Sequence, residues 1–254
     1  MKRATFLAAV LLAAAVPIAA EADGDMPYLA TITIERAAGS NEALDASIVS
    51  VLHVTDAQRT AALLARIDGV DVTATGDATV SIRFDARPTL HAKPDERHRL
   101  SSWVVDFDEA AIQALVVQLA ETDAEHPRPA QLENFVYEHV TNKSYSRSFD
   151  LASRVAETGE GDCTEHAVLL AALARAHGYA SRIVLGNLIL DLDEGLFAFG
   201  HAWTEIHTGD AWQIFDATRP EQGLSGQQVR YIPLGSIENE GPGYLLSLAE
   251  PMSA

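Results

Sequence analysis

The sequence predicts an α+β protein in which a small β-rich N-terminal unit precedes a region of helices and then strands. Two observations lead to this class. Before residue 85, short β-branched runs with alternating apolar residues predominate. After residue 107, three segments carry apolar residues at helical spacing, and an apolar strand and a hairpin follow them. Strands that are grouped apart from helices are typical of α+β folds.

Four segments of the N-terminal unit have the alternating pattern of strands: residues 28–35, 47–54, 70–75 and 78–84. The dipeptide Gly76-Asp77 is expected to form the turn between the last two. Residues 56–67 have the apolar spacing of a short helix, with Thr55 or Asp56 as its N-cap. This unit contains no pattern that indicates chemistry.

A polar, charged stretch with two prolines, residues 87–102, predicts a linker in which His91 and His98 are solvated. The chain is therefore expected to consist of a signal peptide, a β-rich domain and a larger domain: residues 1–22, 23–100 and 101–254.

The first 22 residues have the pattern of a secretory signal. Lys2 and Arg3 supply positive charge, residues 6–16 are apolar, and Ala20-Glu21-Ala22 resembles a cleavage site, with a cut after Ala20 as the alternative. The apolar run is shorter than the roughly 20 residues of a membrane span, so an uncleaved anchor is the weaker interpretation. The sequence therefore predicts a periplasmic or secreted protein without a membrane span after cleavage.

The composition is that of a globular protein, with 48% hydrophobic and 21% charged residues among 254. The formal net charge of −18 repels nucleic acid and anionic lipid, so neither is an expected partner. We expect this charge to serve solubility, and the sequence leaves the oligomeric state open.

The larger domain is predicted to begin with three helices: residues 108–120, 129–141 and 163–177. Pro129 fits the first turn of the second helix, and Gly178 is suited to end the third. Residues 142–160 are expected to form a polar loop or an irregular helix. An apolar strand, an acidic loop and a hairpin are predicted to follow: residues 181–190, 191–199 and 201–216.

Cys163 is the only cysteine, in the phrase Gly161-Asp162-Cys163-Thr164-Glu165-His166. In an exported protein, a cysteine without an internal partner is a reactive thiol, half of an intermolecular disulfide or an inert buried thiol. Asp162 is a natural N-cap and Glu165 completes a capping-box pattern, which places Cys163 in the first turn of a helix. There, unpaired N–H groups and the helix dipole favour a thiolate and can stabilise an oxyanion.

The neighbours of the cysteine allow further interpretations. Gly159 and Gly161 are expected to leave room for a substrate backbone, whereas the charge of Asp162 opposes a thiolate unless it faces away. Cys163 and His166 are three residues apart on one helix, but without a second cysteine or a paired-histidine motif a metal site is the weaker interpretation. We expect no metal and no cofactor.

A histidine and a carboxylate lie on the predicted hairpin. If Gly209-Asp210 forms a two-residue loop with glycine first in a type II′ turn, Thr208 pairs with Ala211. His201 and Asp216 then lie on one face as diagonal neighbours, about 7–8 Å apart. A three-residue loop would instead place them on opposite faces.

Two interpretations of this pair follow. In the functional one, His201 takes the proton of Cys163 and later protonates the leaving amine, while Asp216 fixes the tautomer of the imidazole. In the structural one, His201 is an edge histidine and Asp216 ends a strand. Trp203, on the same face as His201, is expected to pack or to form a wall of a substrate groove.

Three phrases together resemble the transglutaminase-like superfamily, in particular its bacterial exported branch. They are GEGDCTEHAVLLAALARAHGYASRIVLG (159–186), GHAWTEIHTGDAWQIFDAT (200–218) and, more weakly, NKSYS (142–146). The similarity covers roughly residues 107–220, in which cysteine, histidine and aspartate occur in the family's order.

The resemblance implies a papain-like core, in which a central helix that bears the cysteine packs on an antiparallel sheet. It assigns Cys163 as the nucleophile, His201 as the base and Asp216 as the orienting acid. It also implies amide chemistry through a thioester, and it does not imply calcium.

Candidates for substrate contacts are Gly161, Trp203 and Tyr145, and the second oxyanion donor is expected to be Tyr145 or Trp103. Three functions stay open: hydrolysis of an amide in a protein or peptide, cell-wall peptides included; transfer of the acyl group to an amine; and a non-catalytic periplasmic binding or scaffold module with a relict triad. Hydrolysis is favoured over transfer because water is the abundant acceptor in an open site.

Overall fold

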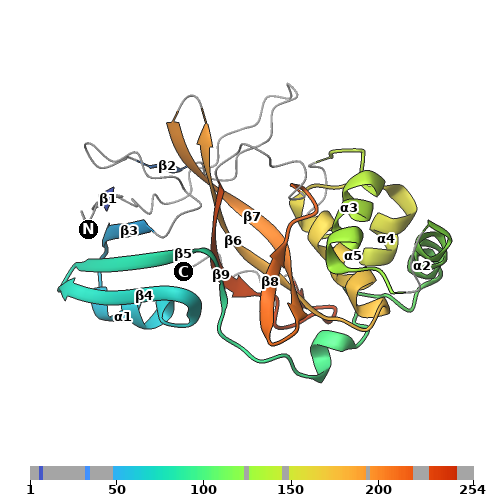
Figure 1. The fold of residues 1–254 in the computed structure, drawn as a ribbon, viewed down its shortest axis with the longest axis horizontal. Coiled ribbons are helices and arrows are strands. Elements are labelled where there is room, and N and C mark those ends of the chain that lie inside the picture. The colour runs from blue at the N-terminus through green and yellow to red at the C-terminus, as the bar shows by residue number, and fades with distance from the viewer. Residues whose placement is uncertain are drawn as a thin grey trace. The chain divides into compact units, whose positions relative to one another are not determined.

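The computed structural model describes residues 6–7, 32–34, 48–122, 126–144, 149–192, 195–219 and 229–244 (Figure 1). They form two compact units, each with an apolar core. Unit 1 takes the described residues within 1–91, 187–200 and 226–233, and unit 2 those within 92–186, 201–225 and 234–254.

Unit 1 contains a sheet with the strand order β1-β3-β5-β4. The strands are β1 (Phe6–Leu7), β3 (Ile48–His53), β4 (Ile67–Gly76) and β5 (Thr79–Leu90). Helix α1 (Ala57–Leu64) begins at Asp56, whose carboxylate accepts the Arg59 N–H at 2.9 Å, and its buried Ala57 packs on the apolar residues of β5. The predicted short helix and the strands of residues 47–84 are therefore confirmed.

The β4–β5 hairpin differs from its prediction at both ends. Gly76 pairs with Thr79, so the turn consists of Asp77 and Ala78 rather than Gly76 and Asp77. A register shift after Asp68, next to Gly69 with φ 83°, lets the pairing continue as far as Leu90. Because a bulge interrupts the alternating pattern, the sequence did not reveal that β5 continues past residue 84.

The prediction of a solvated linker over residues 87–102 is wrong for His98. The 3₁₀ helix η1 (Glu96–Arg99) begins at Asp95, whose backbone N–H donates to the His98 ring at 3.0 Å. This turn brings His98 inward, where it is 5% exposed and meets the Trp212 ring edge-on at 5.2 Å. His91 is exposed, as expected, and bonds Asp68 at 2.6 Å.

Unit 2 contains four α-helices among its described residues: α2 (Ala110–Thr122), α3 (Pro129–His139), α4 (Ala152–Thr158) and α5 (Cys163–Ala176). Helix α5 contacts the other three, and Figure 1 shows them gathered around it. Every α5 residue from Glu165 to Arg175 is buried, so α5 is the predicted central helix. Helix α4 lies where a polar loop or an irregular helix was expected, with Ala152, Val155 and Ala156 buried.

The second sheet has the order β2-β7-β6-β9, and β8 also pairs with β7. Its strands are β2 (Ile32–Ile34), β6 (Ala180–Leu192), β7 (Gly195–Thr208), β8 (Ala211–Phe215) and β9 (Val229–Ser236). The predicted acidic loop of residues 191–199 is wrong for most of its length, because β6 runs to Leu192 and β7 starts at Gly195. Buried Leu196 and Ala198 supply the alternation that keeps this acidic stretch in the sheet.

Helix α5 and the strands of unit 2 share one core. Ala202, Ile206 and Ile183 are buried together with the apolar residues of α5, and the Thr204 hydroxyl donates to the Ala167 carbonyl at 2.8 Å. The predicted class, an α+β core in which the cysteine helix packs on antiparallel strands, is confirmed.

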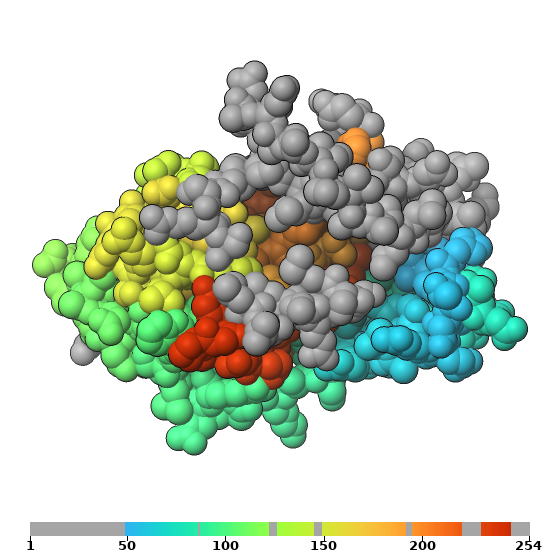
Figure 2. All heavy atoms as spheres, turned by 180° about the vertical axis from the view of Figure 1, so that it is seen from behind, coloured from blue at the N-terminus to red at the C-terminus, as the bar shows by residue number. Residues whose placement is uncertain are grey.

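The segment after β9 contacts the helical part of unit 2. Figure 2 shows its residues in red against the green and yellow residues of the helical layer. Val104 donates its N–H to the Glu240 carbonyl at 3.1 Å, and the Tyr244 hydroxyl donates to the Phe149 carbonyl. None of the helices that the structure describes has the length and apolar character needed to cross a membrane. Apart from residues 6–7, the predicted signal peptide lies outside the described residues.

Candidate active site

The β7–β8 hairpin has the predicted register. Thr208 pairs with Ala211, and the loop between them is the dipeptide Gly209-Asp210, with Gly209 at φ 62°. This register places the His201 Nε2 2.7 Å from the Asp216 Oδ2. The predicted geometric relation between the histidine and the carboxylate is therefore confirmed.

Hydrogen bonds hold both the side chain and the backbone of Asp216. Its Oδ1 accepts the Thr218 backbone N–H at 3.0 Å and the Thr218 hydroxyl at 2.5 Å. Its backbone N–H donates to the Glu133 Oε1 of α3 at 2.6 Å, and both Asp216 and Glu133 are buried. These bonds leave Oδ2 aimed at His201, so the orientation of the carboxylate is fixed before any substrate arrives.

The other side of the His201 ring faces the cysteine. The His201 side chain is 10% exposed, and it makes a hydrogen-bond contact with the Cys163 side chain. Because Nε2 bonds Asp216, Nδ1 is the ring nitrogen that remains for the sulfur. Cys163 is half-buried rather than sealed in the core, as a nucleophile requires.

The electrostatics of this group favour a charged imidazole. Burial by itself lowers the pKa of His201, but the charge and hydrogen bond of Asp216 outweigh it, and the Cys163 contact adds to them. Together they raise the pKa of His201 to about 10. An imidazolium at neutral pH can stabilise a neighbouring thiolate and can donate a proton to a leaving group.

The start of α5 is built by the predicted capping box. The Asp162 Oδ1 accepts the Thr164 N–H at 2.9 Å, and the Glu165 Oε2 accepts the Asp162 N–H at 3.0 Å. The Thr164 hydroxyl also donates to Asp162 at 2.9 Å, so the Asp162 carboxylate is engaged by its own helix. Burial raises the pKa of Glu165, which is 1% exposed and also accepts the Asp150 N–H.

The two glycines before Cys163 have reasons other than substrate access. A Cβ on Gly161, which is buried at φ 155°, would lie 2.2 Å from the Glu165 Cβ. Gly161 therefore makes room for the capping glutamate, and its expected contact with a substrate stays a prediction. Gly159 ends α4 with φ 59°, and a Cβ there would lie 2.8 Å from the His139 carbonyl oxygen.

Two aromatic residues, Trp203 and Tyr145, were expected to contact a substrate. Trp203 is 1% exposed and its ring stacks near His201 at 6.2 Å, so it supports the imidazole from within and does not wall an open groove. This agrees with the packing alternative for Trp203, and its expected contact with a substrate stays a prediction. Tyr145 lies outside the described residues, and its expected role stays a prediction.

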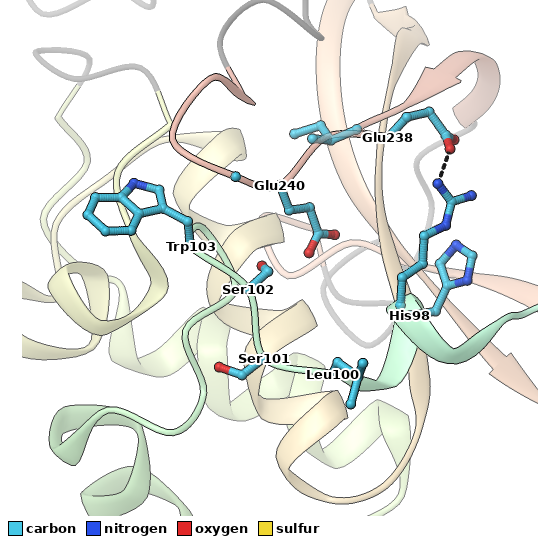
Figure 3. A pocket seen from close by; sticks show the side chains of 10 residues that line it. His98, Leu100, Ser101, Ser102, Trp103, Glu238 and Glu240 are labelled. Carbon is cyan, nitrogen blue, oxygen red and sulfur yellow. Dashed lines mark ion pairs between the residues drawn. The ribbon is translucent and has the colours of Figure 1, made fainter.

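Trp103, the other candidate oxyanion donor, is 54% exposed and lines a pocket of about 320 Å³ (Figure 3). Figure 3 shows Ser102, Glu238 and Glu240 around it, with the Arg97–Glu238 ion pair of 2.5 Å as a dashed line. The residues that line this pocket do not include Cys163.

Several supporting residues could not be found from sequence patterns alone. Glu133 reaches Asp216 across 83 positions of sequence, and Lys143 meets His166 across 23. Thr218 is different, because an aspartate followed two positions later by threonine is a local pattern for a turn in which the carboxylate accepts the second residue's N–H. Within the part of the chain that the structure describes, no three histidine, cysteine, aspartate or glutamate residues are grouped to hold a metal ion.

Comparison with known proteins gives the class of this core. Residues 113–217 match the sequence model of the Transglutaminase-like superfamily, and this segment contains Cys163, His201 and Asp216. The predicted resemblance is confirmed for residues 113–217, whose sequence is transglutaminase-like. No curated protein matches the chain.

The solved structures that are similar to this chain include three that we describe. A "putative cysteine protease" from Cytophaga hutchinsonii is 19% identical with a TM-score of 0.41, over 64% of this chain and 65% of that one. The periplasmic domain of TgpA from Pseudomonas aeruginosa, bound to ethylmercury, is 18% identical with a TM-score of 0.40, over 60% and 66%. A structure named as a TGase is 13% identical with a TM-score of 0.33, over 68% and 51%. The chain thus spans less than two thirds of each.

Proposed function

We propose that this protein is an exported, cysteine-dependent amide hydrolase that acts on a protein or peptide through a thioester intermediate. Cys163 is the nucleophile, His201 the general acid and base, and Asp216 the group that orients the imidazole. The observation that supports this best is the position of His201, which bonds Asp216 through Nε2 at 2.7 Å and contacts the Cys163 side chain.

In the first half of the reaction, the Cys163 thiolate attacks the carbonyl carbon of the substrate amide. The carbonyl oxygen becomes an oxyanion, which the Cys163 N–H, the first N–H of α5, stabilises. His201 donates its proton to the departing nitrogen as the carbon–nitrogen bond breaks. The products are a free amine and a Cys163 thioester.

In the second half, neutral His201 accepts a proton from water as the water oxygen attacks the thioester carbon. Collapse of the second tetrahedral intermediate releases a carboxylic acid and returns the thiolate beside an imidazolium. Asp216 keeps the imidazole ring in position through both proton transfers, because Thr218 and Glu133 hold its own orientation.

An amine could replace water in the second half, and the product would then be a new amide rather than an acid. The same residues serve both reactions, so the choice depends on access of the acceptor. Cys163 is half-buried and reachable from solvent, which favours water as the abundant acceptor.

The test starts with the protein without residues 1–22 and a thiol-directed probe. Incubation with envelope extracts, followed by mass spectrometry of Cys163, is expected to trap acyl groups that identify the substrate class. Release of acid from that substrate supports hydrolysis, whereas incorporation of a labelled amine without acid release contradicts it and favours transfer. A thiol whose alkylation rate does not change in His201→Ala contradicts both and favours a non-catalytic module.

A further inference from the structure

His166 lies on α5 one turn after Cys163 and is 1% exposed. Its Nδ1 is 2.5 Å from the backbone carbonyl oxygen of Asp162, and its own backbone N–H donates to the same oxygen at 3.1 Å. Its Nε2 is 2.7 Å from the Lys143 Nζ. The mechanism above uses neither His166 nor Lys143.

The contact with Lys143 determines the tautomer of His166. An ammonium group has donors and no acceptor, so Nε2 accepts a hydrogen bond from Lys143 and Nδ1 carries the ring hydrogen. That hydrogen is then donated to the Asp162 carbonyl. A second ring proton would have to sit on Nε2 and face the ammonium.

The charges around His166 agree with a neutral ring. Burial lowers its pKa first, and the charge of Lys143 lowers it further. The hydrogen bond to the Asp162 carbonyl and the charges of Asp216 and Asp162 raise the pKa in part. The balance lowers the pKa of His166 to about 4, so the ring stays neutral at physiological pH.

Lys143 lies in a segment that is hydrogen-bonded to the residues just before Cys163. Its Nζ also donates to the Val140 carbonyl at 2.9 Å. Beside it, Asn142 donates its N–H to the Gly159 carbonyl at 3.1 Å and accepts the Gly161 N–H at 3.0 Å. The Lys143 ammonium group is therefore held between the Val140 carbonyl and the His166 ring, although Lys143 as a whole residue is exposed.

The carbonyl that His166 holds belongs to the peptide group between Asp162 and Cys163. A peptide group is planar, so fixing its oxygen also fixes the direction of the Cys163 N–H. This N–H is the first of the helix and has no acceptor within the helix. Donors to the carbonyl also polarise the N–H of the same group.

We propose that Lys143 and His166 are positioning residues for the oxyanion site. Lys143 sets the tautomer of His166, and His166 aligns the Asp162–Cys163 peptide so that the Cys163 N–H meets the oxyanion of the tetrahedral intermediate. This inference rests on the proposed function, because it assigns an oxyanion donor to that same nucleophile.

Two reactions of the Cys163 sulfur test the proposed roles of Lys143 and His166. Acylation by p-nitrophenyl acetate passes through a tetrahedral oxyanion, whereas alkylation by iodoacetamide forms none, so only the first needs the oxyanion site. In Lys143→Met, acylation is expected to fall about tenfold and in His166→Phe about a hundredfold, since one oxyanion donor contributes roughly 10²–10³. Alkylation is expected to change by less than about twofold in both. Lys143→Arg retains a donor for Nε2 and is expected to restore acylation.

The matched control is Lys93→Met, which removes the same charge from another exposed lysine and is expected to change neither rate. Equal loss of acylation and alkylation in Lys143→Met, or unchanged acylation, overturns the inference. Thermal unfolding shows whether His166→Phe is folded, and Lys143→Met, at an exposed position, decides the matter if it is not.

A direct readout is the ¹⁵N spectrum of His166, which is expected to show a protonated Nδ1 and an unprotonated Nε2 in the wild type. The opposite tautomer overturns the inference. A wild type that is acylated but cleaves no amide contradicts the proposed function alone, because the ratio of the two rates still tests the oxyanion site. A wild-type thiol that reacts with neither reagent contradicts both.

Discussion

Two buried ion pairs involve residues of the same strand, β7, and only one of them has the properties of a reactive site. Arg182 bonds Glu205 at 2.5 Å, and both side chains are 3% exposed or less. His201 bonds Asp216 at 2.7 Å, with side chains that are 10% and 3% exposed. Burial and ion-pair geometry are thus nearly the same in the two pairs.

The pairs differ in what the cation touches on its other side. The Arg182 guanidinium lies 4.1 Å from the centre of the Trp212 ring, which covers it. Its charge is permanent, so it cannot exchange a proton. His201 titrates and contacts a half-buried thiol. A buried ion pair therefore marks a candidate site only when one member can transfer a proton to a reactive neighbour.

The largest expected effect comes from His201→Ala. Without the imidazole, the thiol loses its base and the leaving amine loses its acid. Hydrolysis of the amide substrate identified by acyl trapping on Cys163 is therefore expected to fall on the order of 10⁶-fold. The control is His207→Ala, in the same strand but outside the triad. If the two variants lose similar activity, His201 has no special role in the reaction.

Asp216→Asn is the next largest. It keeps the shape of the side chain but removes the charge that raises the pKa of His201 and holds its tautomer. Amide hydrolysis is expected to fall about 10⁴-fold, because the asparagine side chain favours the wrong tautomer of the imidazole. The iodoacetamide rate at neutral pH is expected to fall as well. A variant with normal activity would show that His201 is oriented by other contacts.

The structural pair is expected to respond in the opposite way. In Glu205→Gln, the Arg182 guanidinium stays buried without this carboxylate, which is expected to lower the free energy of unfolding by about 3–5 kcal/mol. Urea unfolding measures this change. The alkylation rate of the folded fraction is expected to stay within about twofold of the wild type, because Glu205 has no proton to exchange with the triad.

The control for this variant is Glu238→Gln, which breaks the exposed pair with Arg97. The side chains of that pair are 51% and 57% exposed, so the expected loss is below about 1 kcal/mol. Equal losses in the two variants would mean that burial of the Arg182 pair adds nothing to its importance.

The two pairs also differ in their response to pH. The pKa of His201 is about 10 in the folded protein against an ordinary value of 6.5, so it is raised. The stability contributed by its charge is therefore fully present below pH 6.5 and is lost as the pH rises through about 10. The free energy of unfolding of the wild type is expected to fall over this window more than that of His201→Ala. Parallel curves for the two proteins would contradict the raised pKa.

What could be predicted from the sequence follows the range of the interactions. The start of α5 depends on Asp162 and Glu165 within one helical turn, and the hairpin register depends on the dipeptide Gly209-Asp210. Both were predicted, because capping and turn chemistry are local. The relation between His201 and Asp216 follows from that register.

The rest could not be predicted because it depends on tertiary contacts. Glu133 looks like any other polar helix residue until α3 brings it to the Asp216 N–H. The sequence did not reveal that Gly161 makes room for Glu165, because a glycine that admits a neighbouring side chain has the same sequence signal as one that admits a substrate. Trp203 was ambiguous because strand alternation does not tell which face of a sheet is covered.

The smallest effect is expected for Thr218→Val, which keeps the shape of the side chain and removes one of the bonds that hold Asp216. The hydroxyl bond to Oδ1 is lost, but the Thr218 backbone N–H still donates to the same oxygen. A single bond to a charged acceptor contributes about 1.5–3 kcal/mol, and the remaining bond limits the loss of orientation. We expect hydrolysis to fall about tenfold, with KM nearly unchanged, because Thr218 acts through Asp216 and touches no substrate. A change confined to KM would instead place Thr218 in contact with substrate, and the imidazole would then depend on Glu133 and the remaining backbone bond alone.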